Sequence, residues 1–428
     1  MEIVTGIFHI FARRLLKTTT IMKKTLFLLL LLSAMTVQAR RWNVQQVKEV
    51  ITRVNTYWQT NNPAEVRSFW DNAAYHTGNM EVYKLFMKTG GQGEKESAKQ
   101  MLDYSIRWAE HNKWQGATET DPAKWKYKQY GEGQDYVLFG DWQICFQTYI
   151  DLFSFELGTL NFEVYDLTKG QGNPKVQNSK FKVQRALEVM GYEADSKEND
   201  YWWWADALYM VMPVMTKMYK LTGDKKYLAK LYDNICYSDG IMLDPETGIY
   251  FRDGKYVWPK HKSANGKKDF WARGDGWVLA GLAKVLQDMP ETYVRQPFFV
   301  NKYTTLARSV ASLQQKEGYW TRSMADPEHA PGPETSGTAF FTYGMLWGVN
   351  NGYLSKKEFA PVIDRAWRYL TETALQPSGK VGYVQPIGER AIPGQTVDQN
   401  SEANFGVGAF LLAACEYARY LEIEKLRK

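Results

Sequence analysis

The chain has 428 residues, of which 44% are hydrophobic and 15% aromatic, and its formal net charge is +6. This size and composition are typical of a globular protein with one large domain or two ordinary ones. No clustered basic stripe of the kind that binds nucleic acid runs through the sequence. The three cysteines and five histidines are too scattered for a disulfide framework or a metal site. We therefore expect neither a nucleic-acid partner nor a metal or other cofactor.

Residues 1–39 have the pattern of an export signal. Met22 is followed by two lysines, by an apolar run too short to span a bilayer, and by small residues that end at Ala39. We expect translation to start at Met22 and cleavage to follow Ala39, which leaves 40–428 as a single domain without a membrane segment. The leader holds five basic residues and one acidic residue, so cleavage lowers the net charge from +6 to +2. The pattern predicts a periplasmic or secreted protein.

Helical periodicity dominates the rest of the chain. Apolar residues recur at a period of about 3.6 through 207–221, a Thr-Gly-Asp turn follows, and a second periodic segment covers 228–235, which together predict a helical hairpin. The same plan is expected at 80–112, 275–315 and 338–375, with further helices at 141–158 and 401–421. Strand-like alternation is confined to links such as 249–257.

The hairpins recur roughly every 55 to 70 residues, a spacing that fits an open solenoid or a closed ring. Small residues on apolar helix faces, such as Gly281, Gly344 and Gly406, allow close packing of an inner ring and favour closure. We predict an all-α fold, an (α/α)6 barrel of six helical hairpins. Loops at one end of such a barrel are expected to hold the functional site.

Three successive tryptophans precede Asp206 in the segment 201–208. Because each residue turns a helix by about 100°, three neighbouring indoles cannot all face one core, so some of them border a site. A helix N-terminus favours the charged form of Asp206, whereas surrounding indoles desolvate the carboxyl and raise its pKa. If desolvation dominates, Asp206 is a proton donor near neutral pH. The alternative is a structural carboxylate beside core aromatic residues.

A second unusual segment, 270–277, combines Trp271 and Trp277 with Arg273 and Asp275. An arginine between tryptophans is a cation on an aromatic surface, and it suits a sugar carboxylate, which it binds through two parallel hydrogen bonds. A buried structural Arg–Asp pair explains the same residues equally well.

Two other helix starts carry polar residues that are candidates for the functional site. Asp141 opens its helix in the same place in its hairpin as Asp206 does in the next hairpin, so both carboxyls are expected to face one site. Thr335 and Ser336 follow a Pro-rich loop and open another helix. They are expected to be helix caps unless that helix start faces the site.

Four segments together resemble a known family. They read YWWWADALYMVMPVMTKMYKLTGD, FWARGDGWVLAGLAKVL, PETSGTAFFTYGMLWGVNNGYL and NFGVGAFLLAACEY. Their order resembles the unsaturated rhamnogalacturonyl hydrolases of glycoside hydrolase family 105 and, more distantly, the unsaturated glucuronyl hydrolases of family 88. The resemblance covers about residues 70–420 and implies the same (α/α)6 barrel.

The resemblance implies removal of a terminal 4,5-unsaturated uronic acid from lyase-generated oligosaccharides. Asp206 matches the general acid and base, which protonates C4 and activates the water that adds to C5, and the hemiketal then opens and releases the saccharide. Asp141 matches the second active-site carboxylate. The positions that match the substrate-lining residues are Trp204, Trp271, Arg273 and Trp277. The expected partner is an anionic unsaturated oligosaccharide, bound by a monomer or weak homo-oligomer.

The sequence departs from the family pattern at two positions. Arg252 stands where many members have a histidine, which places it among the expected substrate-binding residues and favours a different anionic neighbour, such as a sulfated sugar. Asp275 stands where an asparagine is common, which is expected to add a negative charge near Arg273.

Two other classes of protein share parts of the pattern. Sugar epimerases of the same barrel use histidine pairs, and the predicted mature chain has only four scattered histidines. A non-catalytic secreted glycan-binding protein would also be helical and rich in tryptophan, but a lipid-anchor cysteine usually follows its signal, and none follows Ala39. The hydrolase is therefore the favoured interpretation.

Overall fold

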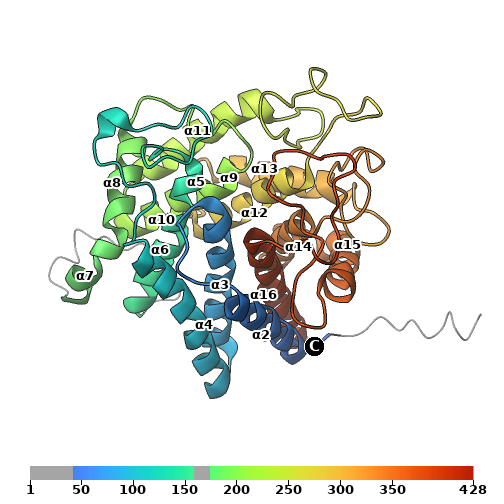
Figure 1. The fold of residues 1–428 in the computed structure, drawn as a ribbon, viewed down its shortest axis with the longest axis horizontal. Coiled ribbons are helices and arrows are strands. Elements are labelled where there is room, and N and C mark those ends of the chain that lie inside the picture. The colour runs from blue at the N-terminus through green and yellow to red at the C-terminus, as the bar shows by residue number, and fades with distance from the viewer. Residues whose placement is uncertain (1–41, 159–173, 428) are drawn as a thin grey trace, which may run out of the picture. The chain divides into compact units, whose positions relative to one another are not determined.

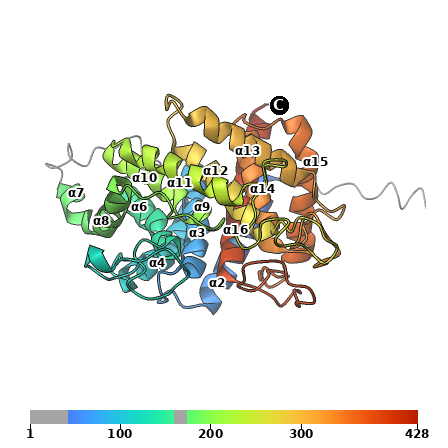
Figure 2. The same ribbon diagram turned by 90° about the horizontal axis from the view of Figure 1, so that it is seen from above.

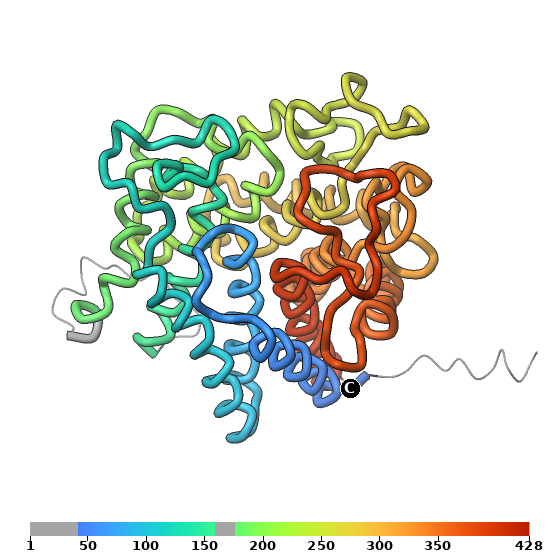
Figure 3. The backbone as a smooth tube through the Cα atoms, viewed as in Figure 1, coloured from blue at the N-terminus to red at the C-terminus, as the bar shows by residue number. Residues whose placement is uncertain are grey.

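The computed structural model describes residues 42–158 and 174–427. The chain divides into two compact units, Met1–Asn43 and Val44–Lys428. The predicted leader, with its start at Met22 and its cleavage after Ala39, lies outside the described residues. Within the described ranges every regular element is a helix, and the strand-like links predicted from the sequence are isolated bridges (Figures 1 and 3). None of the helices in these ranges combines the length and the apolar character that crossing a bilayer requires.

Six helices of the second unit form a closed ring, since each contacts the next and the last contacts the first. They are α3 (Trp70–Thr89), α6 (Cys145–Glu156), α10 (Met212–Thr222), α12 (Ala272–Asp288), α14 (Thr335–Asn350) and α16 (Asn404–Leu426). Short helices α5 (Gly140–Gln143) and α9 (Ala207–Met210) lead into α6 and α10. Every residue of 335–349 is buried, as expected for a helix that is apolar on all sides and surrounded by protein. A Cβ on Gly78 would lie 2.4 Å from the carbonyl oxygen of Gly408, so small residues bring α3 and α16 together.

Six further helices surround the ring, and each packs mainly against one inner helix. They are α2 (Val44–Asn61), α4 (Gln92–His111), α8 (Phe181–Asp195), α11 (Lys226–Met242), α13 (Gln296–Ala311) and α15 (Lys356–Tyr369). Three short helices remain: the 3-10 helix η1 (Pro122–Lys124), the α-helix α7 (Pro174–Ser179) and the π-helix η2 (Leu370–Ala374). The predicted (α/α)6 barrel is confirmed, with α2 as the outer partner of the last inner helix, α16.

The inner helices all begin at the same end of the barrel, because an outer helix lies between each inner helix and the next and returns the chain (Figure 2). The connections at this end are paired with one another by isolated bridges, among them Trp204 with Asp253, Trp271 with Ser323 and Trp320 with Glu334. These pairings fix the loops that surround the starts of the inner helices.

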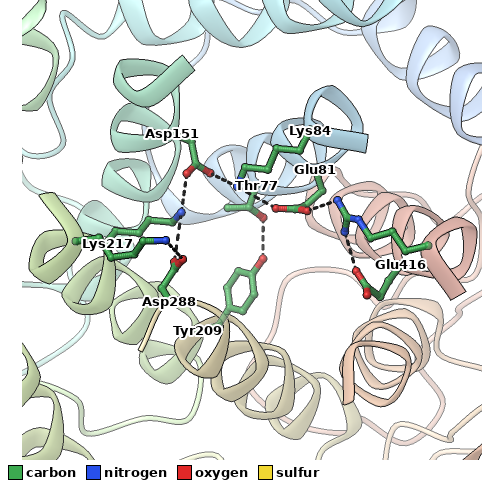
Figure 4. A network of polar contacts seen from close by, with 10 residues as sticks. Thr77, Glu81, Lys84, Asp151, Tyr209, Lys217, Asp288 and Glu416 are labelled. Atoms are coloured by element: carbon green, nitrogen blue, oxygen red, sulfur yellow. Dashed lines mark hydrogen bonds and ion pairs between the residues drawn. The ribbon is translucent and has the colours of Figure 1, made fainter. Parts of the chain in front are cut away.

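A buried network of charged residues joins the inner helices toward their C-terminal ends (Figure 4). Asp151 of α6 accepts hydrogen bonds from Lys84 of α3 at 3.3 Å and from Lys217 of α10 at 2.6 Å. Lys217 also lies 3.7 Å from Asp288 of α12. On the far side of the network, Arg419 of α16 pairs with Glu81 at 2.7 Å. The C-terminal end of a helix favours cations, which fits this collection of lysines and an arginine.

Candidate active site

Four consecutive inner helices begin with the same local pattern: an aromatic residue, one intervening residue, and a charged residue. The charged residues are Asp71, Asp141, Asp206 and Arg273, and the aromatic residues before them are Phe69, Phe139, Trp204 and Trp271. Because these helices begin at one end of the barrel, the pattern brings the charges together. Asp141 interacts electrostatically with Asp206 and Asp71, and Asp206 interacts with Arg273. Asp71 was not among the residues predicted from the sequence, although this repeated pattern identifies it.

Asp206 directly precedes α9 and is 8% exposed. Within the described residues its Oδ2 atom has no hydrogen-bond partner, and the Arg252 Nε lies 3.6 Å away. Burial raises the pKa of Asp206, whereas the charges of Arg252 and Arg273 lower it, and the net pKa lies above the ordinary value. Asp206 therefore has two properties of a proton donor: a raised pKa and an oxygen atom that makes no hydrogen bond within the described residues.

The aromatic residues around Asp206 divide into buried and partly exposed rings. Trp204 is buried and stacks on Phe139 with 4.6 Å between ring centroids. Trp202 is also buried, whereas Trp203 is partly exposed and lies 4.6 Å from the Trp204 ring. Of the three successive tryptophans, Trp203 is therefore the one that has an exposed surface for a ligand.

Asp141 is the second residue of α5 and is also buried. Burial raises its pKa, and the neighbouring charge of Asp206 raises it further, so that the net pKa lies well above the ordinary value despite the nearby Arg252. Interacting carboxyls of this kind titrate as a pair. The pair thus retains a proton in a pH range where an isolated aspartate has lost it.

Arg252 lies beside Asp206 because the main chain around it is paired. The Ala205 N–H donates to the Arg252 carbonyl at 2.7 Å, and Asp253 is bridged to Trp204. The Arg252 side chain is 12% exposed and contacts Asp253 at 2.6 Å. Its Nε, like Asp206 Oδ2, is buried without a hydrogen-bond partner among the described residues. The structure therefore places this sequence-predicted residue next to the candidate proton donor.

Arg273, which the sequence suggested as a carboxylate clamp, bonds to main-chain carbonyls of the protein. Its side chain is 0% exposed and lies over the rings of Trp271 and Phe405, at 4.6 and 4.8 Å from their centroids. Its terminal nitrogens donate to the carbonyls of Gln385, Pro386 and Gly388 at 2.6, 3.0 and 3.3 Å. Burial lowers the pKa of Arg273 to about 10, so it stays charged at neutral pH. It positions the 385–388 segment and affects Asp206 through its charge.

Asp275, for which the sequence suggested a negative charge near Arg273, bonds to the main chain of the link that precedes Arg252. Its Oδ1 accepts a hydrogen bond from the Tyr250 N–H at 2.9 Å, and burial raises its pKa well above the ordinary value. Burial therefore favours the neutral form of this carboxyl, which anchors the link leading to Arg252.

Trp271 and Trp277, both predicted to line the substrate, are buried in the structure. The Trp271 Nε1 donates to the Gln385 Oε1 at 2.8 Å. Trp277 is packed against Tyr209 and Phe340, at 4.8 and 4.3 Å between centroids. Trp277 thus packs with aromatic residues of neighbouring inner helices in the interior of the barrel.

Thr335 and Ser336 begin α14, as expected, but neither is its N-cap. The cap is Glu334, whose carboxylate accepts from the main-chain N–H groups of Ser336 at 3.0 Å and Gly337 at 2.6 Å. Ser336 Oγ donates to Glu334, and Thr335 Oγ1 donates to the Gly382 carbonyl at 2.8 Å. Both side chains are completely buried. They act in positioning the neighbouring loop, because their hydroxyls already bond to protein.

Within the described ranges, no group of three histidine, cysteine, aspartate or glutamate side chains is arranged to hold a metal ion. The groups at this end of the barrel include three carboxyls with raised pKa values, those of Asp71, Asp141 and Asp206, and the guanidinium of Arg252. This arrangement is suited to proton transfer beside an anionic ligand.

Comparison with known proteins identifies the family. The Glycosyl Hydrolase Family 88 profile matches residues 42–421. A curated Formosa agariphila protein named unsaturated 3S-rhamnoglycuronyl hydrolase is 38% identical over 52% of this chain and 59% of its own length. The chain thus spans little more than half the length of that relative.

Two solved structures match more completely. One, described as a polysaccharide lyase, is 59% identical and covers 89% of this chain and 98% of its own, with a TM-score of 0.79. The other, from Bacteroides vulgatus and described as glycosyl hydrolase family 88, is 51% identical and covers 89% of this chain and 100% of its own, also with a TM-score of 0.79. Together with the profile match over most of its length, these findings show that the chain belongs to Glycosyl Hydrolase Family 88.

Proposed function

We propose that the protein removes a terminal 4,5-unsaturated uronic acid from lyase-generated oligosaccharides. The observation that carries this proposal is Asp206, a buried carboxyl with a raised pKa and an oxygen that has no hydrogen-bond partner within the described chain. Its neighbours, Asp141 and Arg252, supply a second carboxyl and a cation. Membership in Family 88 and the name of the Formosa agariphila relative support the same class of reaction.

The reaction begins at the enol ether of the terminal sugar. Asp206, as a carboxylic acid, donates its proton to C4, and the positive charge that develops at C5 is shared with the ring oxygen. Water adds to C5 and gives a proton to the Asp206 carboxylate, which restores the acid. The resulting hemiketal opens to a ketone, and the hemiacetal left at C1 then releases the remaining saccharide. One water molecule is consumed for each bond cleaved. This differs from ordinary glycosidases, whose two carboxylates flank the glycosidic bond.

The neighbouring side chains have distinct parts in this scheme. Asp141 is the proposed second proton-holding carboxyl of the site, because burial and the charge of Asp206 both raise its pKa. Arg252 is the proposed contact for an anionic group of the substrate. Trp203, which is partly exposed, is the proposed stacking surface for a sugar ring.

The function is tested by adding purified protein to lyase-generated fragments and following the ultraviolet absorbance of the unsaturated uronide. We expect the absorbance to fall, because hydration removes the double bond. Ulvan-like fragments are the first choice, since the name of the Formosa agariphila relative refers to a rhamnoglycuronyl substrate; pectic and glycosaminoglycan fragments complete the set. Unchanged absorbance with all three would favour a glycan-binding protein over the hydrolase.

A polysaccharide lyase is the second candidate, favoured by the description of the structure that is 59% identical. A lyase creates the double bond that the proposed hydrolase removes, so the two activities change the absorbance in opposite directions. Intact polysaccharide, which has no unsaturated end, is the matched substrate for this comparison. A rise in absorbance with intact polysaccharide, and no fall with its fragments, would establish the lyase instead.

We further propose a periplasmic or secreted location and a monomer or weak homo-oligomer. Support for the location comes from the sequence pattern of residues 1–39 alone. A mature protein that retained Met22 at its N-terminus would contradict cleavage after Ala39.

A further inference from the structure

Glu389 is a charged residue at the candidate site, and it takes no part in the proposed mechanism. It belongs to a segment that is tied to the starts of two inner helices. Arg273 of α12 donates to the Gln385, Pro386 and Gly388 carbonyls, and the Gln385 N–H donates to Glu334 at 3.1 Å. The segment 385–389 is therefore held in place beside Arg252 by contacts that do not involve Glu389 itself.

The Glu389 carboxylate is shared among three donors. Its Oε2 lies 3.5 Å from the Arg252 Nη1 and 3.2 Å from the Lys255 Nζ, and its Oε1 accepts a hydrogen bond from the Tyr256 hydroxyl. The side chain of Glu389 is 46% exposed, whereas that of Arg252 is 12% exposed. Partial burial raises the pKa of Glu389, but Tyr256, Lys255 and Arg252 lower it to a net value below the ordinary one. Glu389 is thus a charged carboxylate on the exposed side of a largely buried arginine.

The position of Arg252 relative to Asp206 indicates what else it can bind. In the proposed reaction Asp206 must reach C4 of the unsaturated ring, and the carboxylate of that ring is attached to the adjacent carbon, C5. Arg252 Nε lies 3.6 Å from Asp206 Oδ2, so a substrate whose C4 meets Asp206 brings its carboxylate close to Arg252. The Nη1 nitrogen of the same guanidinium, which Glu389 approaches at 3.5 Å, is a donor of the kind that binds a carboxylate.

We propose that Glu389 occupies, in the free protein, the position on Arg252 and Lys255 that the uronate carboxylate of the substrate takes during binding. Glu389 is then a specificity-determining residue: a ligand must carry its own negative charge in the right place to displace it. An uncharged sugar leaves the Arg252–Glu389 pair intact and gains nothing from the arginine. This inference rests on the proposed function, because that function places C4 of the substrate at Asp206.

The test is Glu389→Gln, which removes the charge and retains the shape and an oxygen that can accept from Tyr256. Without the competing carboxylate of Glu389, a larger fraction of the protein has Arg252 open to the substrate. KM for an unsaturated disaccharide should therefore fall by roughly threefold to tenfold, and kcat should change by less than about twofold. For the same disaccharide with its carboxylate converted to a methyl ester, KM should be the same in the variant and the parent protein. The matched control is Glu246→Gln, another exposed glutamate paired with a lysine, Lys268, which should leave both KM values unchanged.

Binding of D-glucuronate, followed by tryptophan fluorescence, separates this inference from the proposed function because it needs no turnover. Tighter binding by Glu389→Gln than by the parent protein supports the inference even if no unsaturated substrate is consumed. A KM or dissociation constant that is unchanged or increased in Glu389→Gln, with normal thermal stability, overturns it. The inference is also overturned if Glu389→Gln lowers KM equally for the methyl ester and for the free acid.

Discussion

Replacement of Asp206 by asparagine is expected to lower kcat/KM on an unsaturated disaccharide by at least about 10³-fold, because the amide can neither donate the proton to C4 nor accept one from water. The fold should be retained, since asparagine has the same shape and Asp206 Oδ2 makes no hydrogen bond within the described chain. The measurement is the initial rate of absorbance loss, together with the thermal unfolding midpoint of each protein.

The matched control for this variant is Asp195→Asn, which makes the same chemical change at an exposed residue paired with Lys226 and should leave the rate unchanged. The pH profile of the parent protein provides an independent check. Only the protonated carboxyl donates to C4, so the rate should decline as the pH rises through the raised pKa of Asp206. An Asp206→Asn protein that kept a tenth of the parent activity would remove Asp206 from the mechanism.

The largest expected effect on stability comes from Asp151→Ala, in the buried charged network of Figure 4. Burial raises the pKa of Asp151, but Lys217 and Lys84 lower it to a net value below the ordinary one, so it is charged in the folded protein. Its removal takes the shared carboxylate from two buried lysines, which keep only Glu81 at 3.1 Å and Asp288 at 3.7 Å, and breaking a buried ion pair costs about 3–5 kcal/mol. The free energy of unfolding, measured by urea titration, should fall by this amount.

The comparison variant for the network is Asp103→Ala, at an ion pair with Arg107 on the outer helix α4, where the carboxylate is 64% exposed. Exposed pairs contribute about 1 kcal/mol or less, so this substitution should have little effect. If Asp151→Ala were as stable as Asp103→Ala, the network would not hold the inner helices together in the manner described above.

The barrel could be predicted because inner and outer helices leave different signals in the sequence. An inner helix such as α14 is apolar on nearly every side, and its small residues mark close packing. Two outer helices, α2 and α8, were not predicted. Their buried residues nevertheless recur at helical spacing, as Val47, Ile51 and Val54 do in α2 and as Val183, Ala186 and Met190 do in α8, so the sequence does carry a helical signal there.

The candidate site was predictable to the extent that its residues share a local pattern. Asp141 and Asp206 were recognised at helix starts, and Asp71 could have been, since it follows an aromatic residue at the same spacing. The role of Arg273 could not be predicted, because its partners at 385–388 lie more than 100 residues away in the chain. The same applies to Glu389, which approaches Arg252 only in the folded barrel.

The most direct test of the proposed chemistry is a proton NMR time course of the parent protein acting on an unsaturated disaccharide. Hydration at C4 and C5 predicts that the signal of the vinyl proton at C4 disappears before the saccharide is released, or together with it. Free saccharide that accumulated while the vinyl signal persisted in the product would show attack at the glycosidic bond. That result would contradict the role of Asp206 as the donor of a proton to carbon.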